Sequence, residues 1–341
     1  MHQISSAVDI GGAVVAEANG RASMISFVVP AFNEVECIAE FHSQLTAVLS
    51  GLDRPAEVIY IDDGSTDGTA ALLDAIAAAD DRVAVAHMRR NYGKSAALDL
   101  GFRMAAGTIV FTLDADLQDD PVEIPRFLAA LEAGSDVVSG WKKLRHDPID
   151  KTLPSLVFNW FTRKVSGLEL HDFNSGFKAY RREALAELRL YGELHRYIPV
   201  LLHWEGFKVG EIDVAHRARF AGKSKFGARR LLNGAFDLMT VILTSKFRSR
   251  PLHFFGYIGV ALGALGVLVF LYLFFLTFFE IDPFRPRPLL YASMVMIFTS
   301  VVFLATGLLG ELMKSLSPEV ADYRLRNVAR HGEAGVERRD E

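Results

Sequence analysis

The sequence is poor in cysteine and has no excess of positive charge. Cys37 is the single cysteine among 341 residues, so the chain forms neither an internal disulfide nor a cysteine-based zinc site. This usage is consistent with a reducing compartment. The formal net charge is −4, which gives no sign of the clustered basic face that binds nucleic acid. We therefore expect no nucleic-acid partner.

The first 23 residues lack the features of a signal peptide. They have no basic segment at the start, and their apolar stretch, 10–18, is interrupted by Gly11, Gly12 and Glu17. We interpret residues 1–23 as a flexible leader. A short first helix is the alternative.

Charged residues are also absent from two long stretches near the C-terminus. Residues 251–279 contain no Asp, Glu, Lys or Arg in 29 positions, and residues 289–310 contain none in 22. A membrane-spanning helix needs about 20 such residues. Two such stretches in tandem disfavour the buried helix of a soluble protein, and the linker 280–288 is short and proline-rich. The pattern predicts a two-helix transmembrane hairpin over residues 251–313.

Basic residues near the ends of the hairpin predict its orientation. Cytoplasmic flanks carry an excess of Lys and Arg. The outer flanks contain Lys246, Arg248, Arg250, Lys314, Arg324, Arg326 and Arg330, whereas the connecting loop contains Arg285 and Arg287. We therefore predict an integral membrane protein with both termini, the N-terminal domain and the tail 314–341 in the cytoplasm.

Apolar strands alternate with helical segments from residue 24 to about residue 215. Strands are expected at 24–30, 57–61, 83–87 and 108–113, and helices at 34–49, 66–79 and 94–105. This alternation predicts an α/β fold, with helices on both faces of a mostly parallel sheet. We assign residues 24–228 to this domain, whose ligands would bind at the carboxyl ends of the strands.

A different pattern precedes the hairpin, in residues 229–250. Arg229, Arg230 and Lys246 bracket an apolar run. This pattern favours an amphipathic helix on the membrane surface, because it directly precedes a membrane span. A helix packed on the soluble core is the alternative.

Two carboxylates follow the fourth expected strand, at Asp114 and Asp116, with Gln118 close behind. An isolated Asp-x-Asp more often caps a helix or lies in a solvated loop. At the end of a parallel strand, however, both carboxylates can face one cation. Mg²⁺ or Mn²⁺ prefers oxygen ligands and is usually bound by one or two carboxylates together with substrate phosphates. Such a cation would stabilise a departing diphosphate.

Polar loops also follow the first and second expected strands. Pro30, Phe32 and Glu34 belong to the first loop, and Asp62 and Asp63 to the second. Each loop alone would be read as a helix-capping turn. Together with the Asp114 loop they end three strands of one sheet, so they are expected to converge on one cleft.

The runs SFVVPAFNE, IDDGSTDGT, RRNYGKSAALDLGF and LDADLQDDP resemble the family 2 glycosyltransferases of the GT-A fold. The later runs GWKKLRHDP, HDFNSGFKAYRRE and GKSKFG resemble the polyprenyl-phosphate branch of that family, which includes the dolichol-phosphate mannosyltransferases and bacterial enzymes acting on undecaprenyl phosphate. The sequence has no Gln-x-x-Arg-Trp motif, which argues against processive polymer synthesis.

The resemblance implies a nucleotide-sugar donor, linked to uracil or guanine, and a set of residues that hold it. The donor-binding residues would be Pro30, Phe32, Glu34, Asp62, Asp63, Lys94, Ala115, Arg219 and Lys225. Asp114 and Asp116 would act in catalysis, and Asp116 and Gln118 would hold Mg²⁺ or Mn²⁺.

The acceptor phosphate requires cations, which Lys and Arg supply. We expect Lys143, Arg145, Lys151 and Arg163 to bind it, although each alone would be ordinary surface charge. Asp172 is the candidate catalytic carboxylate near the acceptor, with a capped turn as the alternative. The histidines have no ligand spacing and are assigned no metal.

We therefore predict inverting, metal-dependent transfer of a sugar to a polyprenyl phosphate, at the bacterial inner membrane. Three alternatives stay open: a nucleotide-sugar-binding subunit without turnover, a lipid-linked-sugar transporter and a nucleotidyltransferase. Two spans are few for a transport pathway. The sequence leaves open the sugar, the base, the prenyl chain length and whether the chain forms a homo-oligomer.

Overall fold

The computed structural model describes residues 24–143, 149–186, 188–215, 239–240, 243, 251–279 and 288–316, without the side chains of 149–157, 314 and 315. The chain divides into two compact units, Met1–Met239 and Thr240–Glu341. Each unit is described separately below.

The first unit is built on a seven-stranded sheet in its described part. The strands are β1 (Ile25–Ala31), β2 (Ala56–Asp62), β3 (Val83–His87), β4 (Ile109–Thr112), β5 (Val137–Trp141), β6 (Lys178–Arg181) and β7 (Val209–Asp213). Their spatial order is β3-β2-β1-β4-β6-β5-β7. β6 runs antiparallel to both neighbours, and the other pairs are parallel. The predicted mostly parallel sheet is confirmed.

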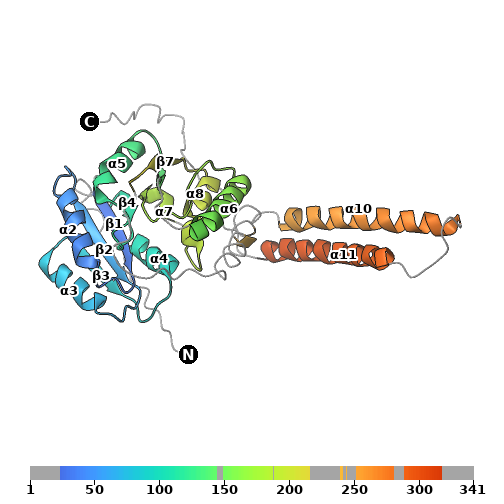
Figure 1. Cartoon of the computed structure of the whole chain (residues 1–341), viewed down its shortest axis with the longest axis horizontal. Helices are drawn as coiled ribbons and strands as arrows, with labels where there is room; N and C mark the ends of the chain where they lie inside the picture. The colour runs from blue at the N-terminus through green and yellow to red at the C-terminus, as the bar shows by residue number, and fades with distance from the viewer. Residues whose placement is uncertain are drawn as a thin grey trace. The chain divides into compact units, whose positions relative to one another are not determined.

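Helices cover both faces of this sheet (Figure 1). The helical elements are α2 (Ile38–Leu49), α3 (Thr69–Ala79), α4 (Lys94–Met104), η1 (Pro121–Glu123), α5 (Ile124–Glu132), α6 (Ile149–Ser166), α7 (Arg182–Leu185), η2 (Leu194–Arg196) and α8 (Ile198–Trp204). Alternate residues of β1 point to opposite faces. Phe27 joins the core that contains Phe41 of α2, whereas Val28 faces Gly101 of α4, where no side chain would fit. Burial on both faces explains why β1 is apolar except at Ser26.

Two helices begin later than the sequence pattern indicates, because polar side chains shape the turns before them. α2 begins at Ile38 rather than at 34, since Glu34 and Asn33 belong to a tight turn in which Asn33 has a φ of 56°. α3 begins at Thr69 rather than at 66, because residues 66–68 form a turn in which the Asp67 carboxylate accepts the Thr69 amide hydrogen at 3.0 Å.

The antiparallel β6 has a consequence for the site. Its first residue, Lys178, pairs with Thr112 at the end of β4. β5 is parallel to β4, so its last residue, Trp141, also lies at the carboxyl edge of the sheet. Residues 142–143 and 175–178 therefore reach the same edge as the loop after β4.

The second unit contains α10 (Pro251–Phe278) and α11 (Pro288–Ser315), which run side by side in opposite directions (Figure 1). Both helices are long and apolar enough to cross a membrane. Glycines make the contact close: a Cβ at Gly266 would lie 3.0 Å from the Ser293 carbonyl oxygen. Large apolar side chains face outward, including Tyr257 and Phe298, each 71% exposed. This agrees with the predicted hairpin. Most of the predicted interfacial helix, 229–250, lies outside the described residues.

Candidate active site

Three of the predicted loops meet at the carboxyl edge of the sheet. β1 lies between β2 and β4, so Asp62 at the end of β2 and Asp114 after β4 are separated by one strand. Neighbouring strands are about 4.8 Å apart, so β2 and β4 lie about 10 Å apart across the sheet. Pro30 is in β1, which lies between β2 and β4, and Phe32 and Glu34 follow it; all three residues are half-buried. The structure thus brings these predicted donor residues together.

Asp114 is held by a lysine from the neighbouring helix. Lys94, the first residue of α4, forms an ion pair with Asp114 Oδ1. Burial raises the pKa of the Asp114 carboxyl, but the charges of Lys94, Lys142 and Lys178 lower it overall. Asp114 is therefore ionised at neutral pH. Ala115, the adjacent predicted residue, is buried.

Asp116 lies in a more negative environment. Its Oδ1 accepts the Gln118 amide hydrogen at 3.2 Å, across a turn in which Leu117 has a φ of 62°. Burial, Asp114 and Asp119 together raise the pKa of the Asp116 carboxyl. Carboxylates gathered in this way favour a cation between them.

The donor set fits a divalent cation that substrate phosphates would share. In the part of the chain that the structure describes, no three His, Cys, Asp or Glu side chains are arranged to hold a metal ion by themselves. Mg²⁺ and Mn²⁺ sites of this kind commonly use one or two carboxylates and complete their coordination with phosphate oxygens. Asp116 and Gln118 would supply the protein ligands.

Two lysines at this edge were not singled out from the sequence. Lys142 Nζ lies 2.8 Å from Asp119 Oδ1. Burial lowers the pKa of Lys142, but Asp119 raises it overall, so Lys142 stays charged. Lys178 is buried and donates to the Ser175 carbonyl oxygen. Burial and the charge of Lys94 lower the pKa of Lys178 to about 8. Lys142 lies in the run GWKKLRHDP and Lys178 in the run HDFNSGFKAYRRE. The resemblance of these runs to the family is the signal that could have identified both lysines.

The predicted donor residue Asp63 holds the neighbouring loop. Its two carboxylate oxygens accept the amide hydrogens of Tyr92 at 2.6 Å and Gly93 at 2.8 Å. Gly64 has a φ of 73° and lies against Arg90, where a Cβ would clash with the backbone. Because Gly93 directly precedes Lys94, Asp63 helps to place the lysine that pairs with Asp114.

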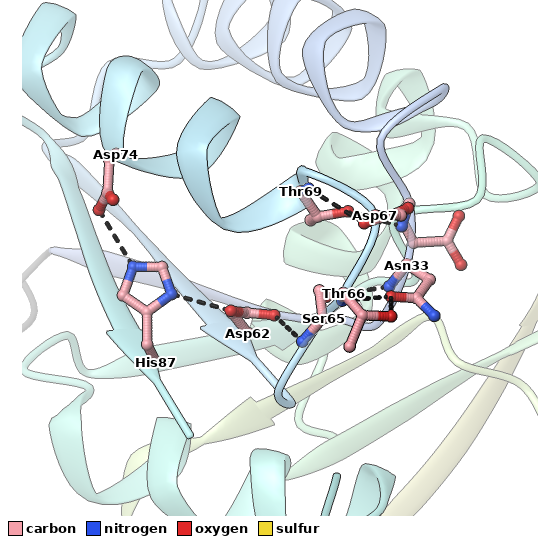
Figure 2. Close-up of polar contacts among 9 residues, drawn as sticks. Asn33, Asp62, Ser65, Thr66, Asp67, Thr69, Asp74 and His87 are labelled. Carbon is pink, nitrogen blue, oxygen red and sulfur yellow. Dashed lines mark hydrogen bonds and ion pairs between the residues drawn. The ribbon is translucent and has the colours of Figure 1, made fainter. Parts of the chain in front are cut away.

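Hydrogen bonds join the first loop to the second (Figure 2). The Asn33 amide N–H donates to Ser65 Oγ at 3.0 Å, and Asn33 Oδ1 accepts the Thr66 amide hydrogen at 2.8 Å. The Glu34 amide N–H donates to Thr69 Oγ1 at 2.9 Å. The loop that carries Phe32 and Glu34 is therefore anchored to the loop that carries Asp62.

Asp172 is buried in a turn next to a small pocket. It is 1% exposed, and its Oδ1 accepts the Asn174 amide hydrogen at 3.0 Å. This is the geometry of a capped turn, which the sequence offers as the alternative to a catalytic role for Asp172. The neighbouring His171 stacks on Trp141, with ring centroids 4.0 Å apart, and its Nδ1 lies 2.7 Å from Glu211 Oε2. Trp141, His171, Glu211 and Lys143 line a pocket of about 360 Å³.

The predicted acceptor residues are only partly described. Lys143 is exposed at the rim of this pocket, 5.7 Å from the centre of the Trp141 ring. Arg163 Nε donates to the Leu170 carbonyl oxygen at 3.1 Å, so this guanidinium also fixes the chain after α6. Arg145, Arg219, Lys225 and the side chain of Lys151 lie outside the described residues.

Residues 26–189 match the family model described as glycosyl transferase family 2. The chain is 34% identical over 296 residues to a dodecaprenyl-phosphate galacturonate synthase from Rhizobium johnstonii, covering 85% of this chain and 87% of that protein. It is 32% identical over 308 residues to an undecaprenyl-phosphate 4-deoxy-4-formamido-L-arabinose transferase from Shewanella sediminis, covering 89% and 90%.

The fold is also similar to that of a solved structure. Glucosyl-3-phosphoglycerate synthase from Mycobacterium tuberculosis, in complex with Mn²⁺, UDP-glucose and phosphoglyceric acid, superimposes with a TM-score of 0.52 and 21% sequence identity, covering 67% of this chain and 82% of that chain. At this identity the likeness concerns the fold alone.

Proposed function

Because the chain belongs to glycosyl transferase family 2, we propose that it transfers a sugar from a nucleotide-sugar donor to a polyprenyl phosphate. The carrying observation is the Asp114 and Asp116 pair at the carboxyl end of β4, surrounded by Lys94, Lys142 and Lys178. The similarity to two polyprenyl-phosphate transferases supports the acceptor class. The alignment with the galacturonate synthase covers 296 residues, which is more than the length of the first unit, Met1–Met239. The similarity therefore extends into the second unit.

The donor would lie across the ends of β1, β2 and β4. Pro30, Phe32, Glu34 and Asp62 would contact the nucleobase and ribose, because their loops are joined by the Asn33 hydrogen bonds. The diphosphate and sugar would then extend toward Asp114. UDP- and GDP-linked donors both satisfy this arrangement.

A divalent cation would be held by Asp116 and Gln118 and by the donor's phosphates. When bound, it would neutralise the charge that develops on the departing diphosphate. Lys142 interacts electrostatically with Asp114, Asp116 and Asp119, and Lys178 interacts with Asp114 and Asp119. Both lysines therefore add positive charge at the same edge of the sheet.

The acceptor would approach from the side of Trp141 and Lys143, where Lys143 would bind the lipid phosphate together with Arg145, Lys151 and Arg163. A phosphate monoester is largely ionised at neutral pH, so a strong general base is unnecessary. A phosphate oxygen would form a bond to the anomeric carbon, as the bond from that carbon to the donor diphosphate breaks. One such displacement inverts the anomeric configuration, and the protein contributes positioning and charge stabilisation.

Asp172 would orient the acceptor or stabilise positive charge at the anomeric carbon. Its burial beside Lys178, whose pKa it raises, supports a position near the reacting groups. The capped turn at Asn174 engages Oδ1 of Asp172 and would hold the carboxylate in one orientation.

The second unit would anchor the enzyme in a membrane. α10 and α11 expose apolar side chains along their length, as lipid contact requires. The basic residues before 251 and after 313 support a cytoplasmic location for the first unit, at the inner face of a bacterial inner membrane.

The experiment is to incubate the purified full-length protein with Mn²⁺, undecaprenyl phosphate and a panel of UDP- and GDP-sugars labelled in the sugar. The proposal predicts label in an organic-extractable, acid-labile lipid, with release of one nucleoside diphosphate per transfer. A parallel incubation with a nucleoside triphosphate and a sugar 1-phosphate tests the alternative, since formation of a nucleotide-sugar with release of pyrophosphate would identify a nucleotidyltransferase. Donor binding without product from any sugar would favour a binding subunit.

A further inference from the structure

His87 ends β3, the outermost strand on its side of the sheet, and it lies directly opposite Asp62 in the parallel ladder between β2 and β3. Its Nδ1 is 2.9 Å from Asp62 Oδ2, and its Nε2 is 3.0 Å from Asp74 Oδ1 on α3 (Figure 2). The imidazole thus bridges the carboxylates of Asp62 on β2 and Asp74 on α3.

This geometry favours a hydrogen on both ring nitrogens. A neutral imidazole has one N–H and one lone pair, so it would turn a lone pair toward one of the two carboxylates. An imidazolium donates to both. In the described chain, the charged groups that face His87 from the elements packed against β3 are Asp62 of β2 and Asp74 of α3. The hydrogen bond to Asp62 is the main influence that raises the pKa of His87, against the effect of burial.

The charged imidazole has a direct effect on Asp62. Asp62 is 2% exposed, and burial favours its neutral form. The hydrogen bonds from His87 and from the Ser65 amide N–H, at 2.9 Å from Asp62 Oδ1, overcome burial and lower the pKa of the Asp62 carboxyl. Asp62 also accepts a hydrogen bond from the Ser65 side chain. A carboxylate offers about four lone pairs, so about one remains beside these three hydrogen bonds. Asp62 is therefore ionised and fixed in orientation.

We propose that His87, backed by Asp74, is a positioning residue that presents the ionised Asp62 to the imino N–H of the donor's base. This inference rests on the proposed function, which places the base at Asp62. An imino N–H is present in uracil and guanine and absent from cytosine and adenine, so the pair would also select among nucleotides. His87 acts through Asp62 and does not touch the sugar that is transferred.

The test measures binding of UDP, GDP, CDP and ADP, each with Mn²⁺, to the full-length protein between pH 6 and pH 9, by titration calorimetry. Three variants are compared with the wild type: His87→Gln, Asp74→Asn and, as a matched control, His42→Gln. His42 Nδ1 lies 3.1 Å from the hydroxyl of Tyr60, two residues before Asp62 on the same strand. Ratios of variant to wild-type Kd remove the titration of the nucleotide's own phosphate.

We expect His87→Gln to weaken binding of UDP or GDP about tenfold at pH 6, the size of one lost charge-assisted hydrogen bond. The defect should shrink as pH rises and the wild-type imidazole loses its proton. Asp74→Asn should bind normally at pH 6, with the pH-dependent weakening moved to lower pH. His42→Gln should follow the wild type at every pH, and kcat at saturating donor should be retained in all three.

Wild-type affinity and pH dependence in His87→Gln would overturn the role of His87 while leaving the proposed function intact. Equal weakening at every pH in both His87→Gln and His42→Gln would indicate a structural effect and would also overturn it. Failure of the wild type to bind any of the four nucleotides would instead overturn the donor site itself.

Discussion

Gly176 lies against the carboxyl group of Asp114, and a Cβ at this glycine would come 2.6 Å from Asp114 Cγ. The segment is fixed in place by Thr112 Oγ1, which donates to the Gly176 carbonyl oxygen at 2.8 Å. Since Lys94 also pairs with Asp114 Oδ1, the carboxylate has little room to move. The glycine is thus a steric requirement of the site.

Gly176→Ala should therefore reduce transferase activity more than it reduces stability. The added methyl group would displace the Asp114 carboxylate and disturb its ion pair with Lys94, and overpacking of this kind costs about 1–3 kcal/mol. We expect kcat to fall at least tenfold with a modest decrease in Tm. Gly51→Ala is the control, because a Cβ there makes only an ordinary contact, at 3.5 Å from the Val48 carbonyl oxygen. Full activity in Gly176→Ala would contradict the assignment.

Lys94→Met should impair turnover through Asp114. The change keeps the apolar length of the side chain but removes the charge that holds Asp114 Oδ1. We expect kcat/KM for the donor to fall roughly tenfold to a hundredfold, as for loss of one preorganised electrostatic contact. Lys208→Met, at an exposed lysine, is the matched control. If both variants show wild-type kinetics, the ion pair has no part in the reaction.

The main elements of the fold could be predicted from sequence because their signals are local. β3 is predicted at its observed bounds, and the acidic pair after β4 is singled out by its Asp-x-Asp spacing and its position after a strand. The antiparallel β6 was missed, since strand pairing across distant segments leaves no periodic signal. The same reason explains His87, which meets Asp62 25 positions away only through the register of two strands. Lys178 acquires its low pKa from burial, which composition does not reveal.

Asp80 should make the free energy of unfolding of the first unit depend on pH in the acidic range. Arg82 forms two side-chain hydrogen bonds with Asp80, at 2.9 and 2.7 Å, and chiefly these lower the pKa of Asp80 from 3.8 to about 2. A carboxyl with a depressed pKa stabilises the folded state above pH 3.8, and this contribution is lost as pH falls toward 2. Asp80→Asn should therefore cost about 1–2 kcal/mol at neutral pH and progressively less below pH 4.

Thermal unfolding of wild type, Asp80→Asn and the exposed control Asp53→Asn, between pH 3 and pH 7, checks this expectation. The difference in Tm between wild type and Asp80→Asn should narrow on acidification, whereas Asp53→Asn should follow the wild type. A difference that is constant across this range would show that the Asp80 charge is not responsible.

The hairpin should depend on the small residues between α10 and α11. A Cβ at Gly263 would lie 2.6 Å from Ser300 Oγ, so Gly263→Ala should separate the helices and lower Tm in detergent. Because the clash is with one side chain, adding Ser300→Gly should recover much of the loss. Gly256→Ala is the control, since a Cβ there meets nothing within 4 Å. Additive losses in the double variant would argue against this contact.

We propose that the carboxylates after β4 are required for sugar transfer to a lipid phosphate. The most direct test is the rate of lipid-linked sugar formation by Asp116→Ala, with donor, Mn²⁺ and undecaprenyl phosphate all saturating and nucleotide binding measured in parallel. We predict that the variant folds with a wild-type Tm and forms no detectable product. A wild-type rate in Asp116→Ala would contradict both the metal assignment and the account of the reaction.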